Sequence, residues 1–270
     1  MSNEFQPTPD SPVPSVSLSA AEIQAEGQTG IKPIPIAPWW HTVILVALIL
    51  ANSLLGSSKL QSVGSGGHGS RLLLYGGTFI TQLVLILIVW FGIRLRGVRM
   101  RDLIGGRWET VESFLLDVGL AIGFLVVALG LLFALRVALG LVDLKHLQKS
   151  TDETVRILGP IAPHSYLEAG FWLIIAVSAG LFEEIIFRGY LQRQFSGWMK
   201  NVAFGIVVSG IIFGLAHGYQ GPRNMVVLAV FGMFFGVMAY LRKSLRPGMI
   251  AHALQDAIAG IALFAFVARH

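Results

Sequence analysis

The sequence predicts an all-α fold, a polytopic bundle of about seven transmembrane helices, and its composition and patterning both support this. Of the 270 residues, 54% are hydrophobic and only 13% are charged, whereas soluble domains carry roughly 25% charged residues. The apolar residues also form continuous blocks that approach the roughly 20 residues a helix needs to cross a bilayer. Transmembrane strands are excluded because these blocks do not alternate between apolar and polar positions.

The expected helices fall into two groups separated by a loop. Residues 1–38 contain most of the prolines and almost no apolar periodicity, so we expect a disordered cytoplasmic tail. Residues 39–142 should hold three transmembrane helices, residues 143–166 a loop, and residues 167–270 a four-helix core. The expected spans are, in order, 39–55, 72–93, 114–135, 169–191, 202–217, 225–241 and 247–267.

The first three spans carry few polar groups. Trp39 and Trp40 open the first span, as aromatic residues do at a membrane interface. The Gly/Ser-rich stretch 64–70 predicts a flexible loop before the second span. In the third span, Asp117 and Arg136 lie near opposite ends, so we expect both to reach toward the membrane surface.

The distribution of Lys and Arg predicts the orientation of the chain. These residues are concentrated in the loops after the second, fourth and sixth spans, which places those loops and the amino terminus in the cytoplasm. The formal charge of +5 therefore fits a membrane protein and not a nucleic-acid partner. There is no cysteine, which excludes disulfides and thiolate chemistry. A short, cysteine-free chain of this kind suits a bacterial plasma (inner) membrane, with an internal eukaryotic membrane as the alternative.

Glu183 and Glu184 stand side by side within the apolar fourth span, where a charged side chain is costly and marks a functional site by default. Glu184 and Arg188 are four residues apart, so they share one helix face and can pair. Glu183 points about 100° away from Glu184. One carboxylate can thus be neutralised by the arginine while the other faces a different surface.

Two histidines follow on later spans. Phe213 and His217 close the fifth span, and His252 and Asp256 lie four residues apart on the seventh. A carboxylate one turn from a histidine commonly fixes the tautomer of the ring. Taken singly, each residue has an ordinary structural explanation as an interfacial or helix-packing group. Together with Glu183 they supply carboxylates and imidazoles from three helices.

That set of side chains suits two hydrolytic chemistries. In the first, Glu183 activates a water molecule, and the histidines and Asp256 stabilise the tetrahedral intermediate. In the second, a divalent metal such as zinc lowers the pKa of a bound water. The candidate metal ligands are Glu183, His217, His252 and Asp256.

Three short motifs on the last four spans resemble those of the CPBP (Abi) family of intramembrane proteases, which includes the type II CAAX prenyl endopeptidases. The resemblance covers residues 167–267. It implies an endopeptidase, usually described as a metalloprotease, with its site inside the membrane. It also implies a membrane-anchored or lipidated peptide or protein as substrate, as in CAAX processing. The motifs are Glu183-Glu184-x-x-x-Arg188, Phe213-x-x-x-His217 and His252-x-x-x-Asp256.

The resemblance further implies a role for each motif residue. Glu183 and His217 would activate the water, and His252 and Asp256 would stabilise the oxyanion. Family members often have Asn where this chain has Asp256, and an ionised Asp cannot donate a hydrogen bond. Asp256 must therefore be protonated, orient His252 or bind a metal. The supporting residues would be Glu184, Arg188 and Phe213.

The depths of the two histidines conflict with straight, upright helices. Measured along its own span from the cytoplasmic side, His217 would lie about 24 Å deep and His252 only about 8 Å deep. The two can meet only if their helices are tilted, broken or sunk below the interface. Glycines in the fifth and sixth spans fit seams of close helix packing better than hinges. They are Gly205, Gly210, Gly214, Gly232 and Gly236.

Two functions from other classes also fit buried polar residues. A proton-coupled transporter would use buried Glu, His and Asp as a relay, but the two halves of the chain show no convincing repeat. A non-catalytic membrane scaffold or immunity protein would use them only to join helices. Groups within hydrogen-bonding reach, or one water apart, favour the peptidase. Polar groups dispersed over more than about 10 Å favour the scaffold.

Overall fold

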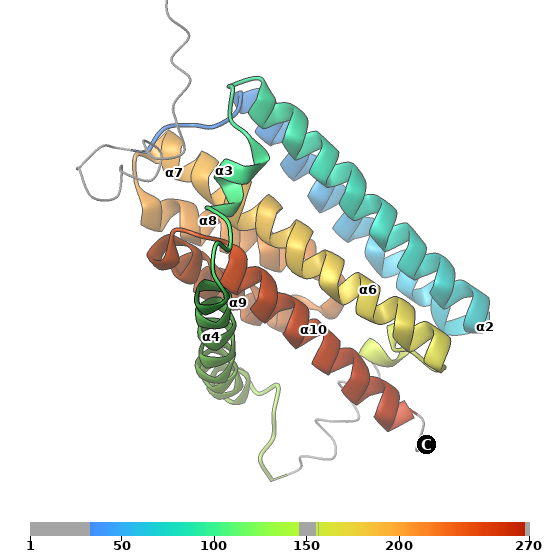
Figure 1. Ribbon diagram of the computed structural model, residues 1–270. Helices are drawn as coiled ribbons and strands as arrows, with labels where there is room; N and C mark the ends of the chain where they lie inside the picture. Colours follow the sequence, from blue (N-terminus) through green and yellow to red (C-terminus); the bar gives the residue numbers. More distant parts are fainter. Residues whose placement is uncertain (1–32, 146–154, 156, 268–270) are drawn as a thin grey trace, which may run out of the picture.

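The computed structural model describes residues 33–145, 155 and 157–267, and every regular element within them is a helix (Figure 1). Within these residues, six stretches are long and apolar enough to cross a membrane, and residues 202–216 form a shorter apolar helix. The prediction of an all-α polytopic bundle is therefore confirmed. The six stretches are Trp39–Gly56, Arg71–Arg94, Val111–Ala138, Tyr166–Met199, Pro222–Arg242 and Arg246–Val267.

Helix α2 (Trp39–Arg94) contains the first two spans, which lie side by side as an antiparallel pair (Figure 1). His41 near its start lies against its far end, with Nε2 2.8 Å from the carbonyl oxygen of Ile88 and the ring against Gly92. The chain must therefore reverse between the spans. The Gly/Ser-rich stretch 64–70, predicted to be a flexible loop, lies between the two spans, where this reversal occurs.

The carboxy-terminal half begins with one long, distorted helix. Helix α6 (Tyr166–Glu183), the π-helical segment η2 (Glu184–Gln192) and helix α7 (Arg193–Met199) follow one another without a break. Ser165 caps α6 by accepting a hydrogen bond from the Glu168 amide. The other elements are α3 (Met100–Ile104), α4 (Val111–Ala138), η1 (Gly159–Ile161), α8 (Val202–Ala216), η3 (Gly218–Gln220), α9 (Pro222–Arg242) and α10 (Arg246–Val267).

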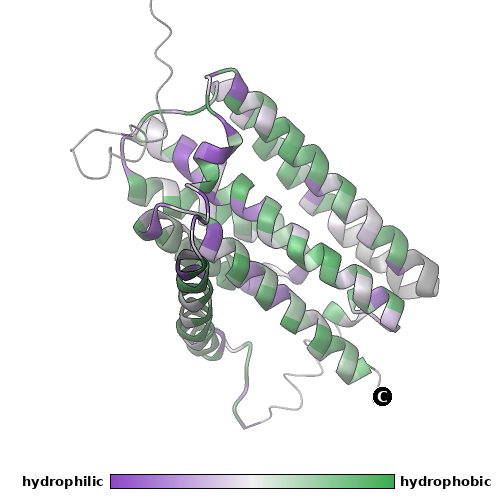
Figure 2. Ribbon diagram, in the orientation of Figure 1, coloured by the Kyte–Doolittle hydropathy of each residue, from purple (hydrophilic) through white to green (hydrophobic). Residues whose placement is uncertain are grey.

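The loops that are rich in Lys and Arg meet at one end of the bundle. The guanidinium of Arg193 in α7 donates to the carbonyl oxygens of Asp102 and Leu103 in α3. The amide of Leu245, just before α10, donates to the carbonyl of Ile104. Hydrophilic residues gather around α3 in Figure 2. Helix α3 thus covers the point where α10 begins, and the first residues of α10 are buried beneath it.

The segment before α2 also lies at this end. The Gln194 side chain in α7 accepts hydrogen bonds from the amides of Ile36 and Ala37 and donates one to the Ala37 carbonyl. These bonds hold residues 33–38 against α7. Residues 1–32 of the predicted tail lie outside the described residues.

The sequence led us to expect that Asp117 in α4 would reach toward the membrane surface. It does not, because its side chain is fully buried. Its carboxylate accepts a hydrogen bond from the Trp108 ring nitrogen at 2.9 Å. Nitrogens of Arg242 and Arg246 lie 3.0 and 3.1 Å from its oxygens. These partners replace the solvation that burial removes. The cluster ties α4 to the end of α9 and the start of α10.

The expectation that glycines form packing seams is confirmed between α8 and α9. A Cβ atom added to Gly214 would collide with the backbone of Met225, and one added to Gly210 would collide with Met233. Gly232 of α9 in turn lies against Gly210 and Phe213. Small residues allow such close helix approach in membranes. The seam holds α8 in the place from which it presents Phe213 and His217.

Candidate active site

The glutamate pair lies where the α-helix changes to a π-helix. Glu183 ends α6 and Glu184 begins η2, all nine residues of which are buried. Single-turn π segments are rare and often occur at functional sites. One turn earlier, Gly180 allows α10 to approach, since a Cβ there would strike Met249 and Ala253. This contact brings the glutamates opposite the part of α10 that carries His252.

Glu184 is the centre of a buried ion pair. Its Oε1 accepts a hydrogen bond from Arg188 at 2.9 Å, as the four-residue spacing predicts. The same oxygen accepts one from His252 Nδ1 at 3.0 Å. Both glutamate and arginine side chains are only 1% exposed. The guanidinium and the imidazole together hold the Glu184 carboxylate in place.

Aromatic rings and one carbonyl complete the surroundings of Arg188. The guanidinium lies 4.5 Å from the Phe213 ring centroid and 5.0 Å from that of Phe235, within the range of cation–π attraction. It also donates to the carbonyl oxygen of Gly232 at 3.1 Å. Arg188 therefore connects η2 to both α8 and α9.

Glu183 faces a different direction from Glu184, as the helical offset predicts. Its side chain is 20% exposed, and its Oε2 is buried without a hydrogen-bond partner among the described residues. The Nε2 atom of His252 lies 3.8 Å from this oxygen and 3.7 Å from Oδ2 of Asp256. These separations are too long for direct hydrogen bonds. One water can join such atoms, because it needs to lie only about 2.8 Å from each.

His217 lies near this group without bonding to it. Its Nδ1 lies 2.9 Å from the carbonyl oxygen of Phe213, and a carbonyl only accepts, so Nδ1 carries the proton and Nε2 is free to accept. The Phe213 ring centroid lies 4.7 Å from the His217 ring and 6.0 Å from the His252 ring. In the described part of the chain, no hydrogen bond or ion pair links His217 to Glu183, His252 or Asp256.

Tyr219 is a neighbour of the site that the sequence analysis missed. Its ring centroid lies 6.1 Å from that of His217, and its hydroxyl accepts a hydrogen bond from Gln220 at 3.1 Å. Burial raises the pKa of Tyr219 to about 12, and the charges of Glu183 and Asp256 act in the same direction. Its hydroxyl therefore stays protonated near neutral pH. Its spacing from His217 is the one signal that could have found it.

The four residues predicted as metal ligands were compared with the grouping that a metal ion needs. Among the residues that the structure describes, no three His, Asp or Glu side chains are grouped as metal ligands would be. Of the four candidate ligands, His252 lies within 4 Å of both Glu183 and Asp256, and the rings of His217 and His252 both face the Phe213 ring. Metal ligation by these residues stays a prediction from the sequence.

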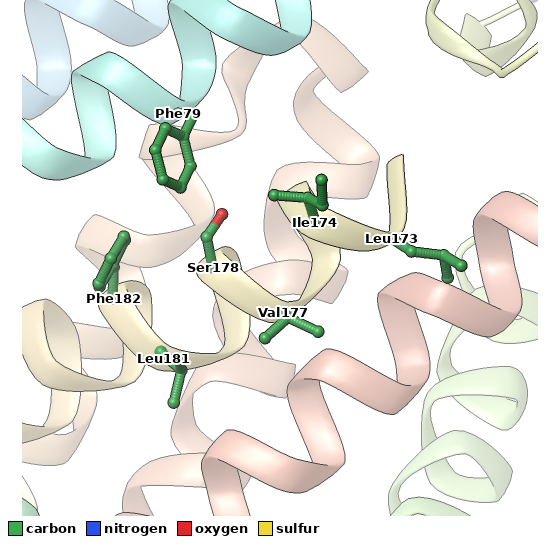
Figure 3. A pocket seen from close by; sticks show the side chains of 7 residues that line it. All are labelled: Phe79, Leu173, Ile174, Val177, Ser178, Leu181 and Phe182. Atoms are coloured by element: carbon green, nitrogen blue, oxygen red, sulfur yellow. The ribbon is translucent and has the colours of Figure 1, made fainter. Parts of the chain in front are cut away.

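An open apolar groove of about 460 Å³ lies beside the site but contains none of its polar groups. In Figure 3, Phe79 projects from α2 toward Ser178 and Phe182 of α6. Phe182 directly precedes Glu183 in the chain. The groove is lined almost entirely by apolar side chains, so the chemistry is better located by the buried carboxylates and imidazoles.

Comparison with known families adds an independent observation. Residues 165–258 match the family model described as type II CAAX prenyl endopeptidase Rce1-like. The matched segment contains every motif residue discussed above, and it confirms the resemblance that those motifs predict. No curated protein and no solved structure matches the chain.

Proposed function

We propose, from the membership of residues 165–258 in the Rce1-like family of type II CAAX prenyl endopeptidases, that this chain hydrolyses a peptide bond of a membrane-anchored substrate. The observation that carries the proposal is the unpartnered, buried Oε2 of Glu183. This oxygen lies 3.8 Å from Nε2 of His252, and that nitrogen lies 3.7 Å from Oδ2 of Asp256, so one water can join each pair of atoms. Separations of one water between acid–base groups are those that catalysis by proton transfer needs.

In the proposed reaction, Glu183 takes a proton from the water between it and His252. The oxygen of that water attacks the peptide carbonyl carbon at the same time. The carbonyl π electrons move to the oxygen, which becomes the oxyanion of a tetrahedral intermediate. His252 can donate to that oxyanion through Nε2 when its ring is protonated, because Nδ1 is already bonded to Glu184. Glu183 then returns its proton to the leaving nitrogen as the carbon–nitrogen bond breaks.

His217 and Asp256 act beside this pair. The free Nε2 of His217 can accept a hydrogen bond from the water and share the base role. Asp256 accepts a hydrogen bond from the same water, and through that water it can orient the His252 ring. An ionised carboxylate can fill this role, because the role requires it only to accept. Glu184, Arg188 and Phe213 keep the reacting groups in place. No metal enters these steps.

The proposed substrate is a peptide or protein held in the bilayer by an attached lipid. The site lies between transmembrane helices, and all residues that line the adjacent groove are apolar except Ser178. The carboxylates occur within otherwise apolar spans, so a lipid-anchored substrate is already held at the depth of the site. We propose a plasma membrane location, with the loops around α3 and the amino terminus on the cytoplasmic side.

The test uses purified protein in liposomes with a fluorescent, prenylated peptide. Glu183→Gln should lower cleavage roughly 10²- to 10⁴-fold, the usual contribution of an acid–base group, and His217→Ala should also lower it. Glu112→Gln, an exposed glutamate of α4, is the matched control and should cleave normally. Activity should persist in EDTA and 1,10-phenanthroline.

Full cleavage by both Glu183→Gln and His217→Ala would refute the proposed chemistry. Inactivation by chelators that zinc reverses would refute the metal-free steps. Proton flux without cleavage, abolished by Glu183→Gln, would identify a transporter.

A further inference from the structure

Ser53 of α2 bonds to the chain on both sides of His217. Its hydroxyl donates to the carbonyl oxygen of Leu215 at 2.6 Å, and its oxygen accepts from the amide of Gly218 at 3.2 Å. We infer that Ser53 is a positioning residue for His217, an inference that rests on the proposed function. Nothing in the family match assigns this residue, because it lies outside residues 165–258.

The end of α8 explains why His217 needs such a support. His217 is the residue that follows the last α-helical position, with φ −103° and ψ 26°. At a helix end the last carbonyls lack the regular partner four residues further on, and the carbonyl of Leu215 is at this end, where the His217 amide also points toward it. Ser53 supplies that partner, so the backbone around His217 is fixed from a neighbouring element.

The fit of Ser53 is close and is supported by a second contact. A Cβ atom on Gly218 would lie 3.0 Å from the Ser53 oxygen, so only glycine allows this approach without adjustment. Three residues later in α2, Gly56 lies against the Tyr219 ring. Ser53 itself is only 7% exposed. The end of the first span thus holds the whole turn that carries His217 and Tyr219.

With its backbone fixed by Ser53, the His217 ring is oriented by its own bond to the Phe213 carbonyl. These two restraints together fix the direction in which the Nε2 atom of His217 points. A misplacement of about 1 Å in a reacting group can cost on the order of 10²-fold in rate. In metal sites, loss of the groups that orient a ligand histidine typically costs about 10–100-fold, and we expect the same range for a histidine oriented without a metal. Ser53→Ala should therefore lower kcat roughly 10–100-fold and leave KM within about twofold, since the hydroxyl does not touch substrate.

The experiment compares Ser53→Ala with Thr78→Val in liposomes. Thr78 is a matched control, because it also lies in α2 and its hydroxyl bonds only to the Leu74 carbonyl one turn earlier. The second measurement does not depend on activity. Protein labelled with ¹⁵N and ¹³C at histidine is placed in nanodiscs, and the His217 ring signal is assigned by its loss in His217→Gln.

Ser53→Ala should shift or broaden the His217 signal and leave the other histidine signals unchanged, and Thr78→Val should change neither signal nor rate. If the wild type cleaves the peptide and Ser53→Ala cleaves it equally well, the inference about Ser53 is wrong and the proposed function stands. The same holds if the His217 signal does not move in Ser53→Ala. A wild type that cleaves nothing would overturn the proposed function, and the His217 signal would still decide the role of Ser53. A uniform change in all histidine signals would show general unfolding and would overturn it too.

Discussion

Two adjacent glutamates have opposite environments in this protein. Glu184 is enclosed by a guanidinium and an imidazole, whereas Glu183 is partly exposed and has a buried oxygen without a partner among the described residues. The sequence alone predicts that the two point in different directions, because neighbours on a helix are about 100° apart. The structure adds which carboxylate is held by two side chains and which has an oxygen without a hydrogen-bond partner among the described residues.

Glu184→Gln should destabilise the protein, because it leaves the Arg188 charge buried without its anion. Breaking a buried ion pair costs about 3–5 kcal/mol, so the apparent Tm in detergent should fall by several degrees. Glu183→Gln should leave the apparent Tm nearly unchanged.

A further change supplies the control for that effect. Arg188→Met should restore part of the lost stability when it is combined with Glu184→Gln, since no unpaired charge then remains. Equal Tm values for the two glutamine variants would contradict the assignment of Glu184 as the supporting residue.

At the scale of single elements, the π-helical segment η2 is the feature that sequence patterns could not reveal. The spacing of apolar residues through 169–191 reads as one uninterrupted helix. The π segment arises from tertiary contacts, among them the buried bonds of Tyr190. Its hydroxyl lies 2.7 Å from His41 Nδ1 and 2.9 Å from the Thr42 hydroxyl, both in α2.

Tyr190→Phe should weaken the attachment of η2 to α2. The substitution leaves buried polar groups of His41 and Thr42 unpaired, at a cost of about 1–3 kcal/mol. Both the apparent Tm and kcat should fall, since η2 carries Glu184 and Arg188. Tyr166→Phe, at an 88% exposed position, is the control and should change neither. Unchanged Tm and kcat in Tyr190→Phe would show that these bonds do not hold η2.

The motif residues were predictable because each has a signature within four positions of the chain, and the pairing of Glu184 with Arg188 is confirmed. Other contacts join residues far apart in sequence and leave no local signal. Ser53 with Leu215 and Asp117 with Arg246 are of this kind. Asp117 was misread as an interfacial residue because its arginine partners lie more than a hundred positions away.

At the scale of the whole molecule, burial of the start of α10 explains how His252 reaches the glutamates. In a straight, upright helix that starts at the membrane surface, His252 would lie close to that surface. In the structure, Arg246 and the residues that follow it are buried, and α3 packs over them. Helix α10 therefore begins below the end of the bundle. Of the three arrangements that would let the two histidines meet (tilted, broken or sunken helices), this is the sunken one.

The grouping of the basic loops predicts a topology that can be measured directly. Arg101 and Lys243 are exposed at the end of the bundle that carries α3, and Lys145 is exposed beyond the other end of α4. Because the chain contains no cysteine, single cysteines at these positions can be labelled without background. In intact cells, an impermeant maleimide should label Lys145→Cys only.

Arg101→Cys and Lys243→Cys should react once the membrane is opened. Labelling of all three variants in intact cells would contradict the fold. Labelling of Arg101→Cys and Lys243→Cys alone would reverse the predicted orientation.

The excess of acidic groups around His252 has a consequence for turnover. Three carboxylates share this small volume with one guanidinium and the imidazole of His252, so they outnumber these two cationic groups even when that ring is protonated. Peptide hydrolysis creates a new carboxylate, which would emerge beside anions already in place. Like charges in a medium of low dielectric constant repel strongly. The severed fragment bearing that new terminus should thus be driven out, and its departure should not limit the pace of repeated cycles.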